Sequence, residues 1–145
     1  MPCILRGATI DDARLLYEWR NDPAARSASR NIVPLDFESH VRWLEGTLKN
    51  SLRELLIAEI DGTPVGTVRL DRSAEGTELS WTVAPGVRRK GIGKAIVALA
   101  CRRAKPPIYA EMQEGNIASI KIAEFAGMSL VKKKDGLLRF ERAIP

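Results

Sequence analysis

Cysteine and long apolar runs are scarce in this sequence, and each absence excludes a class of protein. The two cysteines, Cys3 and Cys101, are too few for a disulfide framework or a spaced metal site. No stretch approaches the run of about 20 apolar residues that a membrane span needs. The N-terminus also lacks the apolar core of a signal peptide. We therefore expect a cytoplasmic protein that binds neither a metal nor a membrane.

Aromatic residues are also few, at 6% of the 145 residues, and they are not interleaved with the basic residues. Because the chain also lacks a recognition-helix signature, nucleic acid is not an expected partner. The 23 Lys and Arg residues against 18 Asp and Glu residues give a net charge of +5, which favours anionic partners without naming one. With 45% hydrophobic residues, residues 1–145 are expected to form one domain with a sizeable core.

The spacing of apolar residues predicts eleven elements in the order β-α-α-β-β-β-α-β-α-β-β. Predicted strands span 3–8, 55–60, 64–71, 77–83, 108–112, 129–133 and 137–142, and predicted helices span about 9–22, 36–49, 91–104 and 116–126. Residues 24–34 show no clear period and are interpreted as an irregular connection. This order is typical of an α/β (α+β) domain around a mixed central sheet.

Two helices carry signals for where they begin. Thr9, with Asp12 three residues later, forms a potential capping box, and Asp36 is a potential N-cap for the second helix. The buried face of the second helix is predicted to consist of Phe37, Val41, Leu44 and Leu48.

Residues 83–95 combine a strand end, a basic glycine-containing loop and a helix start. At a helix N-terminus several amide N–H groups lack intrahelical partners, so a phosphate can accept hydrogen bonds from them. Gly91 and Gly93 would let the backbone approach that phosphate without a Cβ in the way. Four basic residues surround the same point: Arg88, Arg89, Lys90 and Lys94. Each charge-assisted hydrogen bond to a phosphate is worth about 1.5–3 kcal/mol when desolvated, so the segment predicts an anion site.

Neither of two common glycine motifs fits this segment. The dinucleotide fingerprint would need glycine at Ile96, and the phosphate-binding loop would need a Lys-Ser or Lys-Thr pair after Gly91. The pattern Arg88-x-x-Gly91-x-Gly93 after a strand that ends at Val83-x-Pro85 resembles instead the GNAT superfamily of acetyl-CoA-dependent N-acetyltransferases. The predicted element order is similar to that of the family over nearly the whole chain.

This resemblance implies that acetyl-CoA is the cosubstrate and that this loop binds its pyrophosphate. The implied contact residues are Arg88, Arg89, Lys90, Gly91, Ile92, Gly93 and Lys94. It also implies that the strand end at Thr82 and Val83 supplies backbone groups to the pantetheine arm and an N–H to the thioester oxygen, for which side-chain identity matters little. The alternative for the loop is a basic turn before a glycine-initiated helix.

A second part of the resemblance begins at Asn116, which with Ser119 matches a family pattern that continues with a tyrosine and a glycine. By resemblance Asn116 contacts pantetheine, and as a plain N-cap it would be equally satisfied. The sequence departs from the pattern at Ala123, where many members have a tyrosine that protonates the departing thiolate, and Met128 replaces the usual phenylalanine. Expelling a thiol of pKa about 8.5 as its anion at pH 7 costs only about 2 kcal/mol, so an enzyme without that tyrosine is still expected.

The resemblance also suggests a catalytic base, because an amine must be neutral to attack a thioester. Removing the proton at pH 7 costs about 4.6 kcal/mol for a lysine side chain and about 1.4 kcal/mol for an α-amine. Family members often carry a carboxylate on the last strand before the loop, which corresponds to Glu78 here. Glu78 is therefore the candidate base, acting through water, and an exposed strand glutamate is the alternative.

The stretch from Leu15 to Pro23 resembles a branch of the superfamily that includes ribosomal-protein N-terminal acetyltransferases and amino-sugar N-acetyltransferases of pseudaminic-acid synthesis. In that branch this helix borders the acceptor site, which makes Trp19, Arg20 and Asn21 candidate acceptor residues; for Trp19 a place in the core is the alternative. His40, the only histidine, has a pKa suited to a base. A surface or partly packed histidine is the preferred interpretation.

Three functions compete at this stage. They are an acetyltransferase for a small amine such as an amino sugar or nucleotide-linked amino sugar, an acetyltransferase for protein N-termini, and a domain that binds acetyl-CoA without catalysis. The short chain and the basic, serine-rich residues 26–30, which suit an anionic acceptor, favour the first, with a solvated loop as the alternative. An edge strand of the closing hairpin could also pair with a second copy in a homodimer.

Overall fold

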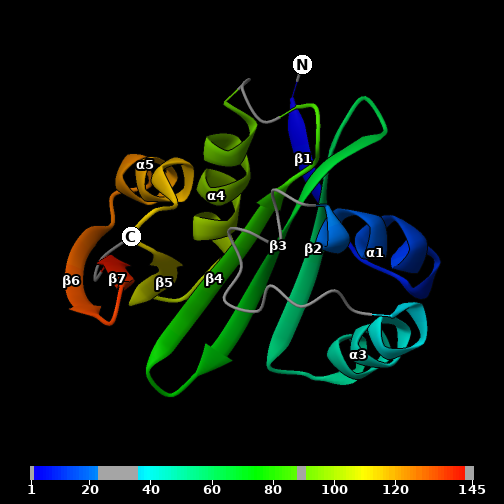
Figure 1. Cartoon of the computed structure of the whole chain (residues 1–145), viewed down its shortest axis with the longest axis horizontal. Coiled ribbons are helices and arrows are strands. Elements are labelled where there is room, and N and C mark those ends of the chain that lie inside the picture. Colours follow the sequence, from blue (N-terminus) through cyan, green and yellow to red (C-terminus); the bar gives the residue numbers. More distant parts are fainter. Residues whose placement is uncertain (1, 23–35, 88–90, 143–145) are drawn as a thin grey trace.

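The protein forms a seven-stranded sheet flanked by helices on both faces (Figure 1). The computed structural model describes residues 2–22, 36–87 and 91–142. The strands are β1 (Cys3–Gly7), β2 (Arg53–Ile60), β3 (Thr63–Ser73), β4 (Gly76–Val83), β5 (Ile108–Gln113), β6 (Ser129–Lys134) and β7 (Leu137–Arg142). The helices described are the 3-10 turn η1 (Ile10–Asp12), α1 (Ala13–Asn21), α3 (Phe37–Lys49), α4 (Ile92–Arg103) and α5 (Ile117–Phe125). The predicted order and the mixed sheet are confirmed.

The sheet is mixed, with the strand order β1-β2-β3-β4-β5-β7-β6. All neighbouring strands pair antiparallel except β4 and β5, which pair parallel and are joined through α4. The tight turn between β2 and β3 uses Asp61 and Gly62, both at positive φ, as the Asp-Gly signal predicts. The parallel junction is therefore the one place where two antiparallel halves of the sheet meet.

Each face of the sheet has its own apolar cluster. Helices α4 and α5 pack together, α4 against β1, β3 and β4 and α5 against β5. Leu79 of β4 and Ile96 of α4 belong to this larger cluster, and both are buried. On the opposite face α1 and α3 lie near β2, where Leu55 and Ile57 pack with Leu44 of α3 (Figure 1). Side chains on β4 therefore alternate between a face covered by α4 and the face that carries α1 and α3.

The predicted helix starts are present in the structure. The Asp36 carboxylate accepts a hydrogen bond of 2.8 Å from the Ser39 N–H, so Asp36 caps α3. The Asp12 carboxylate accepts a hydrogen bond of 2.8 Å from the Thr9 N–H. Thr9 is therefore the N-cap of the 3-10 turn η1, and not of α1 as the sequence predicts. Arg6 holds the same carboxylate with two bonds of 2.9 Å, which lowers the pKa of Asp12 below its ordinary value.

The predicted buried face of α3 is wrong at its C-terminal end. Leu44 is fully buried, but Leu48 is 39% exposed, and the polar side chains of His40 and Thr47 are buried instead. Positions 40, 44 and 47 follow the helical spacing of four and three residues, so the buried stripe is rotated toward the side that holds polar residues. A search for apolar residues alone misses such a stripe.

None of the helices in the described ranges has the length and apolarity required to span a bilayer.

Candidate functional site

The parallel strands β4 and β5 pair over a short distance and then separate. Their ladder consists of Thr77 with Ile108 and Glu78 with Tyr109, and it has no further pair among the described residues. Beyond Glu78, β4 continues for five residues to Val83. Along this stretch the backbone groups of β4 that point toward β5 have no strand to bind. The sheet therefore offers a row of unpaired main-chain donors and acceptors to an elongated ligand.

The N-terminus of α4 lies just beyond the end of this opened stretch. The first bond of the helix runs from the Ala95 N–H to the Gly91 carbonyl at 3.2 Å, so the N–H groups of Ile92, Gly93 and Lys94 precede the intrahelical bonds. These groups carry the positive end of the helix dipole. Lys94 adds a charge and lies over the ring of Phe125 at 5.2 Å. The three basic residues predicted at this loop, Arg88, Arg89 and Lys90, lie outside the described residues.

The two glycines at this helix start have different roles from one another. Gly91 adopts a left-handed φ of 70°, and a Cβ there would meet nothing within 4 Å. At Gly93 a Cβ would lie 2.5 Å from Ile122 Cδ1 and 3.2 Å from Val83 Cγ2. Gly93 thus lies where α4 packs closely against α5 and β4, and a side chain there would force Ile122 to shift. The sequence interpretation assigned this glycine to a phosphate. Its structural effect is to fix the position of the helix N-terminus relative to the opened strand.

Helix α5 begins at the other side of the opening, directly after β5. The Asn116 side chain accepts a hydrogen bond of 3.2 Å from the Ser119 N–H, which confirms the N-cap interpretation of Asn116. Ala123 is fully buried in the apolar cluster that also includes Met128. Its methyl group supplies no proton, so the position that the resemblance gives to a tyrosine holds no acid.

Trp81 is a residue near the opening that the sequence analysis missed. Its ring packs against the same apolar cluster as Ala123, and its indole N–H is buried without a hydrogen-bond partner in the structure. It lies on the opened part of β4, three residues beyond Glu78. The alternation of Leu79, Trp81 and Val83 toward the helix side was the available signal. An unpaired buried donor costs about 1–3 kcal/mol, which is a reason to expect a ligand acceptor nearby.

Glu78 lies at the last paired position before the opening. It is directly opposite Asp71 of β3 on one side and Tyr109 of β5 on the other. Its neighbour Leu79 faces α4, so Glu78 projects to the face that carries α1 and α3. Burial and then the nearby Glu78 carboxylate raise the pKa of Tyr109 above its ordinary value. Asp71 forms ion pairs with Arg69 at 3.0 Å and with Arg53 at 3.5 Å.

The predicted acceptor residues of α1 fall into two groups. Trp19 is 8% exposed and packs in the cluster around Leu44, which supports its place in the core. Arg20 and Asn21 are half-buried near the C-terminal end of α1, and neither is without an interaction partner. The basic residues 26–30 lie outside the described residues. The structure thus brings Glu78, Thr82 and Val83 together on one strand. Trp19 of α1 shares an apolar cluster with Ala84, the residue after β4, so α1 lies near the end of that strand.

His40 is buried, which corrects the preferred interpretation of a surface or partly packed histidine. It is 2% exposed and lies between the rings of Tyr17 and Trp43 at centroid distances of 5.7 and 5.5 Å. Its Nε2 atom is buried and has no hydrogen-bond partner among the described residues. The helix turn that places Leu44 in the core places His40 beside it, so its burial follows from spacing rather than from polarity. Burial, and then the charge of Arg20, lower the pKa of His40 below its ordinary value.

The burial of His40 predicts a pH dependence of stability. Because its pKa is lower in the folded than in the unfolded chain, the unfolded chain binds more protons as the pH falls below about 6.5. The free energy of unfolding is therefore expected to fall from pH 7 to pH 5, by about 1.4 kcal/mol for each unit by which the pKa is lowered. Urea unfolding of the wild type and of His40→Phe checks this. A slope over this pH range that is the same in both proteins would contradict it.

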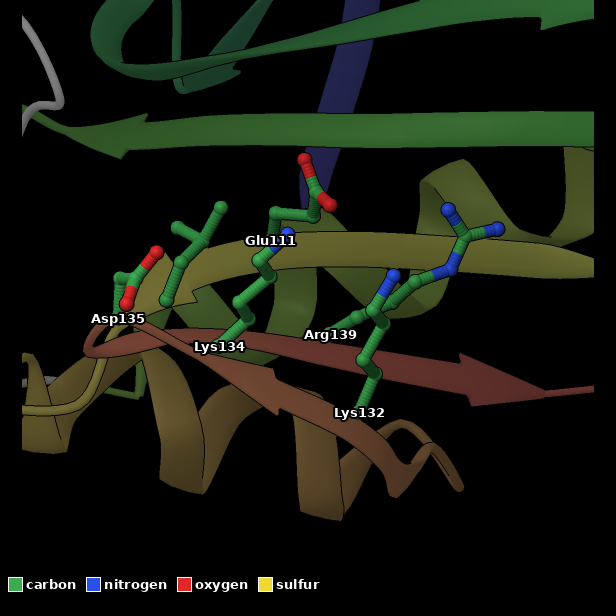
Figure 2. Close-up of a pocket in the computed structure, with 6 residues that line it drawn as sticks. Glu111, Lys132, Lys134, Asp135 and Arg139 are labelled. Atoms are coloured by element: carbon green, nitrogen blue, oxygen red, sulfur yellow. The ribbon is translucent and has the colours of Figure 1, made fainter.

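A shallow groove of about 300 Å³ lies on the same face of the sheet as Glu78, over β5, β7 and β6. Figure 2 shows its labelled side chains, which project from these strands and from the turn at Asp135 to one side. Its lining residues are Glu111, Lys132, Lys134, Asp135, Leu137 and Arg139. Within residues 2–22, 36–87 and 91–142, no group of three or more acidic, histidine or cysteine side chains is arranged to hold a metal ion.

Comparison with known proteins agrees with this geometry. The family model described as an acetyltransferase (GNAT) domain matches residues 3–129. A search of curated proteins finds no match. Among solved structures, a domain from Methanocaldococcus jannaschii is 25% identical, with a TM-score of 0.86 and 98% of both chains covered.

Two further structures have assigned activities. Ribosomal-protein-alanine N-acetyltransferase from Brucella melitensis is 27% identical with a TM-score of 0.79, over 97% of this chain and 99% of that chain. Spermidine N-acetyltransferase from Vibrio cholerae, in complex with CoA and spermine, is 15% identical with a TM-score of 0.84, over 97% and 95% of the two chains. The similarity to the spermidine N-acetyltransferase supports the fold alone.

Proposed function

The chain belongs to the GNAT family of acetyl-CoA-dependent N-acetyltransferases, and we propose that it acetylates the primary amine of a small molecule, with an amino sugar or a nucleotide-linked amino sugar as the best candidate. One observation carries the proposal. The sheet opens between β4 and β5 beside the N-terminus of α4, and Glu78 marks the start of the opening on the opposite face. A coenzyme and an amine can therefore approach the same point from the two faces of the sheet.

The described residues suit the coenzyme in two places. The N–H groups of Ile92, Gly93 and Lys94, which precede the first helical bond among the described residues, suit a pyrophosphate, since several donors converge at one helix end. On the side of β4 that faces β5, the backbone groups of Val83 suit the amide-rich pantetheine arm, which can add to the sheet like a strand, whereas those of Thr82 point toward β3. When bound, the coenzyme supplies an acetyl thioester. In this proposal the β4 main chain orients the thioester, and a backbone N–H of β4 stabilises the developing oxyanion.

Glu78 acts as the base in this proposal. The attacking amine loses a proton as it bonds to the acetyl carbon, and the Glu78 carboxylate accepts that proton through a water molecule. Asp71, its cross-strand neighbour, forms ion pairs with Arg69 and Arg53. The thiolate leaves without help from Ala123, which costs about 2 kcal/mol at pH 7 relative to loss of the neutral thiol.

The choice of acceptor rests on the residues that face the opening. The groove beside Glu78 presents cations and carboxylates together, as a polar, charged acceptor requires. A protein N-terminus is the second candidate, because the Brucella melitensis relative at 27% identity is named as a ribosomal-protein-alanine N-acetyltransferase. The α-amine of a peptide would also need less help from a base than a lysine side chain.

A thiol-release assay tests the proposal. The purified protein is incubated with acetyl-CoA and, in parallel, with free amino sugars, nucleotide-linked amino sugars, polyamines and peptides that begin with alanine. We expect the largest kcat/KM for a sugar amine, with the N-acetyl product identified by mass spectrometry. Preference for the peptides by more than about tenfold, or 1.4 kcal/mol, would replace the small-molecule proposal with the N-terminal one.

A further inference from the structure

The groove on β5, β7 and β6 has a defined order of charges. Glu111 of β5 is directly opposite Arg139 of β7, and Arg139 is opposite Lys132 of β6. The three side chains therefore form a line across the sheet at intervals of about 4.8 Å. Going outward from the opening, a carboxylate comes first and two cations follow. Leu137 and Lys134 form the next line of the same groove.

Lys132 and Lys134 form no ion pair within the part of the chain that the structure describes, although the carboxylates of Glu111 and Asp135 line the same groove. Each has no ion pair or hydrogen bond to another described residue, whereas Lys133 between them forms an ion pair of 2.7 Å with Glu114. This difference follows from strand geometry, because Lys133 is opposite the buried Leu138 and so points to the other face. The groove face of the hairpin thus has two available ammonium groups.

Arg139 connects the groove with the proposed catalytic position. Its guanidinium lies 3.8 Å from the centre of the Tyr109 ring, and Tyr109 is the cross-strand partner of Glu78. Its ion pair with Glu141 is long, at 3.6 Å. Two strand spacings and a step of two residues separate the backbones of Glu78 and Arg139 by about 12 Å. Because both side chains are long, they would meet groups on one molecule that are separated by roughly one sugar ring.

We propose that Lys132 and Arg139 form an anion subsite that binds a phosphate group carried by the acceptor. This inference rests on the proposed function and narrows its substrate class to phosphorylated amines, in which the amine lies toward Glu78 and the phosphate toward β7 and β6. Arg139 suits a phosphate because its planar donors can bind two oxygens, and Lys132 adds a point charge. Glu111, nearer the opening, lies where it would meet the cationic amine end.

The subsite is tested with two sugars that differ only in a phosphate group and with two variants that each remove one lysine charge. Initial rates of thiol release are measured with glucosamine and with glucosamine 6-phosphate, for the wild type, Lys132→Gln and Lys133→Gln. We expect the wild type to favour the phosphorylated sugar in kcat/KM by about tenfold or more, which corresponds to about 1.4 kcal/mol. Lys132→Gln should lose most of that preference through a higher KM. Lys133→Gln, which removes the same charge on the other face, should keep it.

A binding measurement keeps the subsite testable without turnover. Glucosamine 6-phosphate is titrated into each protein with CoA present, and the heat of binding is recorded. Weaker binding by Lys132→Gln than by Lys133→Gln supports the subsite. Equal affinities in the two variants, or equal kcat/KM for both sugars in the wild type, overturn it while acetyl transfer to sugars remains. Thiol release with peptides alone overturns the small-molecule function, and the titration then decides the subsite separately.

Discussion

Glu78→Gln is expected to lower kcat at pH 7 by about 100-fold, the lower end of the range for loss of a positioned general base. The amide keeps the size and much of the polarity of the side chain but accepts no proton at this pH. Since Glu78 lies on the sheet face opposite α4, the affinity for the coenzyme should change little. The defect should shrink as the pH rises toward the pKa of the acceptor amine, because more of the amine is then already neutral.

The control for Glu78→Gln is Glu75→Gln. Glu75 is exposed in the turn before β4, so this variant makes the same charge change close to the same tyrosine without removing the carboxylate at the opening. Its pH–rate profile should match that of the wild type. A profile for Glu78→Gln that also matches the wild type would remove Glu78 from the mechanism.

Gly93→Val is expected to destabilise the protein and to weaken coenzyme binding together. A Cβ at this position would lie 2.5 Å from Ile122 Cδ1 and 3.2 Å from Val83 Cγ2, and valine adds two more methyl groups. Overpacking of this kind costs about 1–3 kcal/mol. Because the clash separates α4 from α5 and β4, the N–H groups of the helix start move away from the opened strand. We expect at least a tenfold weaker Kd for acetyl-CoA by calorimetry and a lower midpoint of urea unfolding.

A second substitution distinguishes packing from a direct role of Gly93 at the phosphate. Ile122→Ala removes the nearest atom that the new side chain would meet and leaves the contact with Val83, so the double variant should regain a large part of both stability and affinity. If Gly93 instead matters because a phosphate approaches its backbone, the double variant should stay defective in binding although its stability recovers. An unchanged Kd in Gly93→Val alone would count against the placement of the pyrophosphate at α4.

Much of the fold can be predicted from the sequence because local signals and the spacing of apolar residues agree. Asp61-Gly62 predicts a tight hairpin and forms one, Asp36 caps α3, and Asn116 caps α5. The basic glycine loop is predicted to bind an anion because it lies between a strand end and a helix start, where unpaired N–H groups favour a phosphate. These features depend on residues that are close in sequence, and such features are the ones a single sequence expresses most directly.

The remaining features of the site depend on contacts between distant segments. A side chain at position 93 would contact Ile122, which is 29 residues later in the sequence (122 − 93 = 29). No local sequence pattern predicts that contact. The sequence favours a surface or partly packed position for His40, yet the side chain is buried beside the aromatic rings of Tyr17 and Trp43. The early end of the β4–β5 ladder likewise has no signal in either strand. The groove was missed for the same reason, as it joins Glu111 with residues of the closing hairpin.

The opening between β4 and β5 also bears on how such a protein can change over evolutionary time. If main-chain groups hold the coenzyme, substitutions along β4 leave that recognition largely intact, because every residue except proline carries the same donor and acceptor. The side chains of Glu111, Arg139 and Lys132 project to the sheet face opposite α4, and they contribute little to the packing of the core. A preference for a new acceptor can therefore arise from substitutions at a few exposed positions, and directed evolution of substrate preference would best begin at this hairpin.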